Sequence, residues 1–293
     1  MSGEHAVVYG RPAIYSAIDR RIYIEISGRG TPGNFKLDKL STLPLASISK
    51  NLPKRVRGIV GVNIKSDIPV GSGMGSSAAF SVALTASMSR FLKENWDLER
   101  INRVAYALEK KHHGNPSGGD NTICTYGGFL WYRKELEEYK TFRSVEVSKD
   151  IPPFFIIDTG RPLESTKEMV QMVGDKRRNS PRDTEIIFNR IEEITKLFLK
   201  SLLVGGSDYG NLIKDNQRLL WELGVVSDST QKLVKRIELI GGAAKVSGAG
   251  GRKGASGIIL GYHKNPRAII DIAQKMNLKV YKVRLGEEGV RLE

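Results

Sequence analysis

The chain contains the stretch Pro69-Val70-Gly71-Ser72-Gly73-Met74-Gly75-Ser76-Ser77-Ala78-Ala79-Phe80, in which three glycines at alternate positions lead into two serines and an apolar run. Glycine lets the backbone approach an anion closely. The first turn of a helix presents unpaired amides and the positive end of the helix dipole. A glycine-rich loop that opens directly into a helix therefore predicts a phosphate-binding site, and the two hydroxyls suit a phosphate oxygen or a metal ion.

This loop differs from two common nucleotide-binding motifs. No Gly-Lys-Ser or Gly-Lys-Thr follows the glycines, which excludes a Walker A loop. No short strand, GxGxxG turn and helix with an acidic residue downstream is evident, which argues against a dinucleotide-binding Rossmann loop. The alternative interpretation of the stretch is a flexible turn that caps a core helix.

Acidic residues that suit phosphoryl transfer lie downstream of the loop. In His113-Gly114-Asn115-Pro116-Ser117-Gly118-Gly119-Asp120-Asn121, one proline and three glycines predict a loop that presents Asp120 as a general base or as an anchor for a substrate hydroxyl. Glu109 lies eleven residues earlier, at the end of a predicted helix. One or two carboxylates with phosphate oxygens are the usual ligands of Mg²⁺ in ATP sites. Taken singly, Asp120 also fits an Asx turn and Glu109 a solvated helix end.

A second glycine-rich stretch, Lys245-Val246-Ser247-Gly248-Ala249-Gly250-Gly251, follows a predicted strand in the C-terminal part of the chain. It predicts either the completion of a phosphate pocket or a tight hairpin. His112, His263 and the single cysteine predict no site, and the pair His112-His113 predicts no metal site. His112 and His113 have no partner four residues away that would complete a metal pair, and Cys124 fits a small packing residue.

Hydrophobic periodicity predicts an α+β protein with a domain boundary near residue 150. The predicted strands are residues 22–26, 60–64, 127–132, 154–157, 257–262 and 278–283. The predicted helices are residues 78–92, 98–108 and 268–276, with further helical stripes between residues 186 and 240. We therefore expect two α+β domains, residues 1–150 and 151–293.

Composition narrows the class of protein. The 293 residues include 46 Lys and Arg against 32 Asp and Glu, a net charge of +14, and 40% are hydrophobic, which is typical of a folded globular protein. No apolar run reaches the ~18–20 residues of a membrane span, no secretory signal is present, and Cys124 has no disulfide partner, so we expect a cytoplasmic protein without membrane contact. The basic residues are spread out and lack interleaved aromatics, which argues against a specific nucleic-acid partner and favours nucleotide phosphates.

Three stretches together resemble the motifs of the GHMP small-molecule kinases. Gly3-Glu4-His5-Ala6-Val7-Val8-Tyr9-Gly10-Arg11-Pro12-Ala13 is similar to the first motif, residues 69–79 to the second and residues 245–251 to the third. Within this superfamily, the Gly-Glu-His-Ala-Val start, Pro116-Ser117-Gly118-Gly119-Asp120-Asn121, and Asp158-Thr159-Gly160 followed by Ser165-Thr166-Lys167 resemble the mevalonate kinase family. The resemblance implies the two-domain α+β GHMP kinase fold, with an N-terminal domain like ribosomal protein S5 domain 2 and a ferredoxin-like C-terminal domain.

The resemblance also implies an activity, the ATP-dependent phosphorylation of (R)-mevalonate to 5-phosphomevalonate in isoprenoid biosynthesis. ATP and mevalonate would be the small-molecule partners, Mg²⁺ the cofactor and a homodimer the assembly. Asp120 takes the catalytic position, and Ser77 and Glu109 take the Mg²⁺ positions. The ATP and phosphate positions are Gly71, Ser72, Gly73, Met74, Gly75, Ser76, Ser77, Gly248, Ala249 and Gly250. The substrate-binding positions are Glu4, His5 and Thr166.

Two departures from the family pattern bear on function. In the family, a Pro-Gly-Lys strand precedes Gly-Glu-His, and its lysine helps to polarise the reacting groups. Here Met1-Ser2 stands before that motif, so we expect weaker catalysis unless an upstream strand or another cation replaces the lysine. Arg252-Lys253 stands where the family continues with glycines, and such cations suit a more anionic substrate. Phosphomevalonate kinase, another GHMP kinase and a catalytically silent binding protein of this fold are therefore the alternatives.

Overall fold

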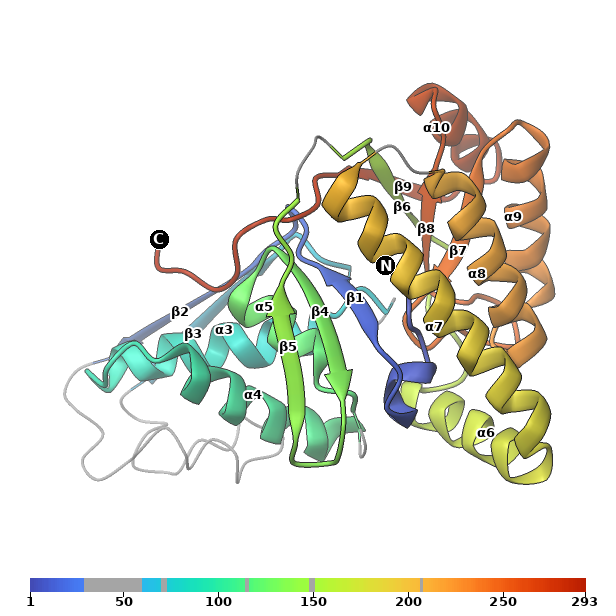
Figure 1. Cartoon of the computed structure of the whole chain (residues 1–293). Coiled ribbons are helices and arrows are strands. Elements are labelled where there is room, and N and C mark those ends of the chain that lie inside the picture. The colour runs from blue at the N-terminus through green and yellow to red at the C-terminus, as the bar shows by residue number, and fades with distance from the viewer. Residues whose placement is uncertain (29–59, 70–72, 114–115, 148–150, 206–207) are drawn as a thin grey trace. The chain divides into compact units, whose positions relative to one another are not determined.

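The structure, a computed structural model, describes residues 1–28, 60–69, 73–113, 116–147, 151–205 and 208–293 (Figure 1). Packing divides the chain into two compact units. Unit 1 comprises Met1–Asp19, Gly71–Met74 and Gly128–Glu287, and unit 2 comprises Arg20–Val70, Gly75–Gly127 and Glu288–Glu293. Each unit combines segments from distant parts of the sequence, so this division does not test a boundary at one position. The domain ranges 1–150 and 151–293 therefore stay a prediction.

Unit 2 combines a strand pair with helices. Strands β2 (Ile22–Gly28) and β3 (Val60–Ser66) are antiparallel, and the helices are α3 (Ser76–Phe91), α4 (Leu98–His113) and α5 (Gly119–Tyr126). Helix α3 contacts β2, where the Ser87 hydroxyl donates to the Ile24 carbonyl oxygen at 2.6 Å. The sequence-based predictions of both strands and of the helices α3 and α4 are confirmed.

Helices α3 and α4 pack through apolar faces. Leu98, Ile101, Ala105 and Leu108 are spaced three or four residues apart, so they share one side of α4. The clusters that they join also contain the α3 residues Val82, Leu84, Ala86 and Met88. Glu109 follows this stripe directly, and its side chain is buried as well. The packing of α3 on α4 thus places an acidic residue inside unit 2.

Helix α5 corrects the prediction of a loop around Asp120. Gly118, with a φ of 86°, precedes the helix, and Gly119 and Asp120 lie in its first turn. The sequence pattern missed the helix because its eight residues are too few for a readable apolar period and because it begins with glycine, a poor helix former. Asp120 therefore lies at the positive end of a helix dipole rather than in an open loop.

Unit 1 contains an antiparallel sheet with the connections of a ferredoxin-like fold. Strands β6 (Phe154–Asp158), β7 (Ala243–Ser247), β8 (Ile258–Tyr262) and β9 (Lys279–Val283) pair in the order β7-β8-β6-β9. Helices connect β6 to β7 and β8 to β9, whereas β7 runs to β8 without one. This is the β-α-β-β-α-β pattern, and the ferredoxin-like prediction is confirmed.

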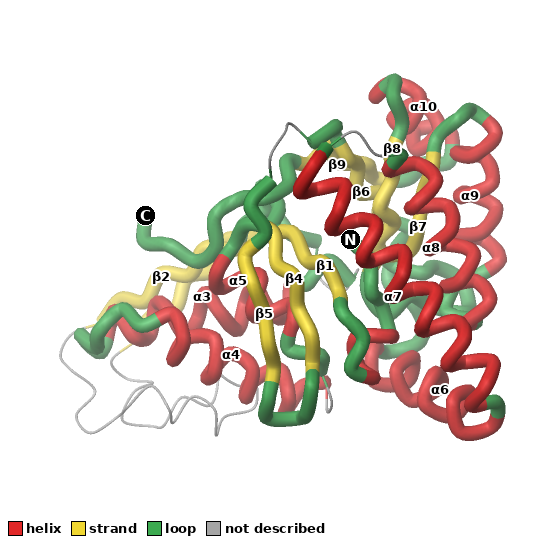
Figure 2. Tube along the Cα trace, viewed as in Figure 1, coloured by secondary structure: helices red, strands yellow, loops and turns green. Residues whose placement is uncertain are grey.

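Helices pack against this sheet (Figure 2). The helices between β6 and β7 are α6 (Thr166–Asn179), α7 (Pro181–Val204), α8 (Tyr209–Leu223) and α9 (Asp228–Leu239), and the helix between β8 and β9 is α10 (Pro266–Lys275). Helices α8 and α9 contact β7, and α10 contacts β8 and β9. Strands and helices share one apolar core that includes Phe154, Phe155, Phe188 and Phe198. Among the described residues, no helix has the length and hydropathy that crossing a bilayer requires.

A second antiparallel sheet in unit 1 anchors the first sequence motif. Strands β1 (Ala13–Ser16), β4 (Phe129–Lys134) and β5 (Lys140–Ser144) pair in the order β1-β4-β5. Ser2 forms a β-bridge to Ile14, and the short 3₁₀ turn η1 (Ala6–Tyr9) lies between Ser2 and β1 in the chain. Residues 2–16 are thereby fixed within unit 1.

Candidate active site

The two residues predicted to bind metal meet in unit 2. Ser77, in the first turn of α3, donates its hydroxyl hydrogen to Glu109 Oε1 at 2.7 Å, and Ser81 donates to the same oxygen at 2.8 Å. Glu109 is only 5% exposed. A buried carboxylate needs such donors because burying an unpaired charge is costly. The structure thus joins the start of the helix after the glycine-rich loop to the acid of α4, and their role toward a metal stays a prediction.

The pKa of Asp120 is raised, although the residue lies at the surface. Asp120 is exposed to solvent, and neighbouring protein atoms displace part of the water around its carboxyl group. Desolvation of the carboxyl group, and secondly the negative charge of Glu109, raise the pKa of Asp120 to about 6. The carboxylate is therefore mostly ionised at pH 7 and close enough to its pKa to exchange a proton readily.

Cys124 lies one turn after Asp120 on α5. Its side chain packs against the cluster of Val82, Ala86 and Ile101, which confirms the prediction of a packing residue. Burial, followed by the negative charges of Asp120 and Glu109, raises the pKa of the Cys124 thiol to about 12. The thiolate is the reactive form of cysteine, so this thiol is inert at neutral pH.

In unit 1, a buried ion pair joins the first motif to the third. Lys245 of β7 is fully buried, and its Nζ donates to Glu4 Oε1 and, at 2.9 Å, to the carbonyl oxygen of Val246. Burial alone would raise the pKa of Glu4, but the positive charge of Lys245 holds that pKa below its ordinary value. Glu4 Oε2 is buried and has no hydrogen-bond partner among the described residues. One oxygen of Glu4 is thus engaged and the other is available.

His5 forms a second link between the same two motifs. Its Nε2 lies 3.0 Å from the carbonyl oxygen of Ala249. Because a carbonyl oxygen can only accept, Nε2 carries the proton and donates. Burial lowers the pKa of His5, so the imidazole is neutral at pH 7. The backbone of His5 has a φ of 60°, a left-handed conformation that is uncommon for a residue with a side chain and tends to occur at functional sites.

The third motif forms a tight loop beside the second. A Cβ atom on Gly248 would lie 3.3 Å from the carbonyl oxygen of Gly73, so the two glycine-rich stretches are close neighbours within unit 1. A Cβ atom on Gly250 would lie 2.1 Å from the carbonyl oxygen of Val225, which also accepts a hydrogen bond from the Gly251 amide at 3.0 Å. With a φ of 71° as well, position 250 accepts only glycine.

We expect Gly250→Ala to lower the free energy of unfolding by about 1–3 kcal/mol or more, since the left-handed backbone strains alanine and the methyl group collides with Val225. Chemical denaturation measures the change. Gly224→Ala is the matched control, because Gly224 has a φ of 85° but open space where its Cβ would lie. The collision is refuted if the two variants lose the same stability.

Other predicted binding residues lie beside these loops or outside the described residues. Gly71 and Ser72 lie outside the described residues. Met74 and Gly75 precede α3, which begins at Ser76. Thr166 is the exposed first residue of α6, directly after the capping residue Ser165. Their contacts with a nucleotide or a substrate stay predictions.

Sequence reasoning missed two polar residues at these sites. Ser81 is fully buried and lies four residues after Ser77, hence on the same face of α3. The spacing of four residues is visible in the sequence. It indicates a site only because both serines donate to Glu109 in the structure. Lys245 belongs to the third motif, but the motif pattern alone predicts no role for its side chain. Its signal was a charge in an apolar strand, flanked by Ala244 and Val246.

Comparisons with known proteins agree with this geometry. Residues 44–128 match the family described as GHMP kinases N terminal domain. The mevalonate kinase of Archaeoglobus fulgidus is 33% identical over 99% of this chain and 95% of the relative, and that of Pyrococcus abyssi is 32% identical over 99% and 94%. The crystal structure of L. major mevalonate kinase in complex with R-mevalonate superposes with a TM-score of 0.76 at 23% identity, over 99% of this chain and 93% of that chain.

These similarities define the class of protein: it has the fold of the GHMP kinases and is an ATP-dependent small-molecule kinase. The similarity to the Archaeoglobus fulgidus enzyme extends through both units, because it covers 99% of the chain. The chain belongs to the mevalonate kinase family.

Proposed function

We propose that the chain transfers the γ-phosphoryl group of ATP to the primary alcohol of (R)-mevalonate, giving 5-phosphomevalonate for isoprenoid biosynthesis. The hydrogen bond from Ser77 to Glu109 carries the proposal, because it ties the start of the phosphate-loop helix to a buried carboxylate. Phosphoryl transfer depends mainly on positioning and charge stabilisation, which such a pair provides. The choice of mevalonate is supported by the names of the most similar relatives.

The donor set in unit 2 fits Mg²⁺. Magnesium prefers oxygen ligands and usually takes one or two carboxylates while phosphates and water complete its coordination. Ser77 and Glu109 offer only oxygen atoms, and no group of three or more His, Cys, Asp or Glu side chains suited to an all-protein metal cage occurs among the described residues. We propose that Ser77 and Glu109 hold Mg²⁺. When bound, the ion supplies positive charge to the phosphate oxygens.

We propose Asp120 as the general base that accepts the proton of the substrate alcohol. Its place in the first turn of α5 and its pKa of about 6 support this role, since a base works best when its pKa lies near the operating pH. Glu109, whose charge contributes to the raised pKa, belongs to the same unit. A positioned base contributes on the order of 10²–10⁴-fold to a rate.

The remaining predicted residues are of two kinds. We propose that backbone amides bind the phosphates and that side chains bind the substrate. Amide groups of residues 71–77 and 248–250 would contact the triphosphate, as the close approach of Gly73 and Gly248 supports. Glu4, His5 and Thr166 would contact mevalonate. For Glu4 the support is its buried Oε2, which has no partner among the described residues and which a substrate hydroxyl would satisfy.

The pH dependence of the reaction follows from Asp120. A base acts only when it is deprotonated, so kcat/KM for mevalonate should rise about tenfold per pH unit below pH about 6 and level off above it. Initial rates at saturating Mg·ATP between pH 5 and 8 measure the profile, and KM for ATP, measured across the same range, serves as the control. A flat profile, or one that falls as pH increases, contradicts the assignment of Asp120 as base.

The direct test of the proposed function is ADP release with Mg·ATP and each of four acceptors: mevalonate, phosphomevalonate, homoserine and galactose. We expect turnover with mevalonate alone. Turnover with phosphomevalonate instead would favour the alternative in which the exposed Arg252 and Lys253 bind an anionic substrate. No turnover with any acceptor, while ATP still binds, would refute the proposed activity. We further propose that the protein is a cytoplasmic homodimer. Size-exclusion chromatography with light scattering tests the dimeric assembly.

A further inference from the structure

Helix α5, which carries Asp120, needs support from the rest of unit 2. It has eight residues, and isolated helices shorter than about 12–15 residues are marginal in water. One support is a side-chain contact near its start, where Asn121 Nδ2 donates to Asn102 Oδ1 of α4 at 2.6 Å. The position of the other end of α5 is set by residues from far along the sequence.

The C-terminal segment, defined here as residues 288–290, pairs with the end of α5. Glu288 and Gly127 form an antiparallel β-bridge. The Val290 amide donates to the carbonyl oxygen of Thr125 at 3.2 Å. Carbonyl groups in the last turn of a helix have no partner within the helix, so this hydrogen bond satisfies a group that would otherwise need water. The segment therefore satisfies one of the free carbonyl groups at the α5 terminus.

The contact between the two backbones is close. A Cβ atom on Gly289 would lie 2.3 Å from the Thr125 carbonyl oxygen and 2.7 Å from the Gly127 nitrogen, so a side chain at position 289 would push the segment away from α5. Val290 also packs into the apolar cluster that contains Cys124 of α5 together with residues of α3 and α4. The segment is thus held to the helix by backbone and by side-chain contacts.

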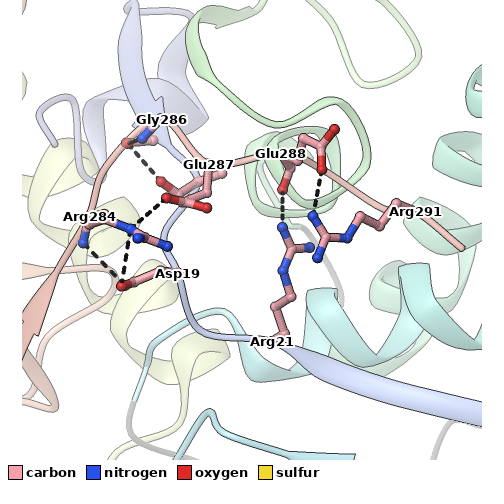
Figure 3. A network of polar contacts seen from close by, with 9 residues as sticks. Asp19, Arg21, Arg284, Gly286, Glu287, Glu288 and Arg291 are labelled. Carbon is pink, nitrogen blue, oxygen red and sulfur yellow. Dashed lines mark hydrogen bonds and ion pairs between the residues drawn. The ribbon is translucent and has the colours of Figure 1, made fainter. Parts of the chain in front are cut away.

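Arginine side chains hold the same segment in place (Figure 3). Arg21, just before β2, donates to the carbonyl oxygens of Glu288 at 3.3 Å and of Gly289 at 3.2 Å. Arg291 pairs with the Glu288 carboxylate at 2.7 Å. Because Arg21 binds backbone oxygens, its contacts fix the path of the chain whatever the side chains at positions 288 and 289.

We propose that the C-terminal segment is a positioning element for the catalytic carboxylate: by fixing the end of α5 at Thr125 and Gly127, it fixes Asp120 at the start of the same helix. At 1.5 Å per residue, Asp120 lies about 7–8 Å along the helix axis from Thr125, so a shift of the terminus moves the carboxylate with it. The inference rests on the proposed role of Asp120. A misplacement of about 1 Å at a reacting group can reduce a rate about 100-fold.

The test compares Val290→Pro, which removes the amide that donates to Thr125, with Leu292→Pro, two residues further on at a side chain that is 55% exposed. We expect Val290→Pro to lower kcat about 10- to 100-fold with KM for ATP changed less than about twofold, and Leu292→Pro to keep both values. Gly289→Val, which forces the same displacement by a different route, should repeat the result. Circular dichroism and thermal unfolding establish that each variant is folded.

A double-mutant cycle separates positioning from a general structural effect. If the segment acts through Asp120, Val290→Pro should lower kcat much less in an Asp120→Asn background than in the wild-type chain. An equal loss in both backgrounds, or wild-type kcat in folded Val290→Pro and Gly289→Val, overturns the inference while leaving the proposed function intact. Wild-type kcat in Asp120→Asn alone refutes the proposed role of Asp120, so the two failures are distinguishable.

Discussion

Replacing Asp120 by asparagine is expected to lower kcat with mevalonate by about 10²–10⁴-fold and to change KM for ATP little. Asparagine keeps the size and the helix position of the side chain but cannot accept a proton from an alcohol. In the proposed mechanism, triphosphate binding depends on other groups, chiefly the backbone of the glycine-rich stretches and the pair Ser77 and Glu109. Steady-state kinetics with varied ATP and varied mevalonate measure the two effects separately.

The matched control for this variant is Asp271→Asn, which makes the same chemical change at an exposed position of α10 in unit 1. It should keep the kinetic constants of the unchanged chain. Nucleotide affinity, measured by isothermal titration with a non-hydrolysable ATP analogue, should be similar in both variants. A kcat within about threefold of the wild-type value in Asp120→Asn would mean that the alcohol loses its proton to another group.

Lys245→Met is expected to lower the free energy of unfolding by about 3–5 kcal/mol, since it leaves the Glu4 carboxylate buried without its cation. Methionine fills a similar volume, so the lost charge rather than a cavity dominates the effect. The change should also raise the KM for substrates, because Lys245 is the first residue of the glycine-rich third motif. Denaturation curves in urea give the stability, and kinetics on the folded fraction give KM.

Two further variants test this explanation. Lys196→Met removes a cation that is 60% exposed and pairs with Glu192, and exposed pairs of this kind are worth about 0–1 kcal/mol. Adding Glu4→Gln to Lys245→Met removes the stranded charge and should restore a substantial part of the lost stability. The explanation is wrong if Lys245→Met costs no more than Lys196→Met, or if the second substitution restores nothing.

Much of the fold was predictable from local patterns. The α4 stripe from Leu98 to Leu108 is regular enough to fix the helix, and the glycine-rich stretch before Ser76 marks the start of α3. Strands β6 and β8 of the ferredoxin-like sheet were readable because β6 begins with four apolar residues and β8 is mostly apolar. Such signals depend on residues close in sequence, so a single chain displays them.

The contacts that build the candidate site were less predictable because they join distant residues. Glu4 and Lys245 are 241 positions apart, and neither position alone shows that the other will neutralise it. Ser81 looks like any small residue of a core helix until Glu109 lies beside it. Helix α5 is too short to display a period, and its support by residues 288–290 leaves no local trace. These features arise from tertiary packing, which local propensity does not determine.

The chemistry of Cys124 has a practical consequence for spectroscopy. It is the only cysteine in the sequence, and its thiol, with a pKa of about 12, has almost no thiolate at neutral pH. Maleimide and iodoacetamide reagents react with thiolates, so a cysteine introduced at an exposed position such as Leu163 in unit 1 would be labelled selectively in the otherwise unmodified chain. A fluorophore or spin label placed in this way can report nucleotide binding in real time, with no need to remove the native residue from the helix that carries Asp120.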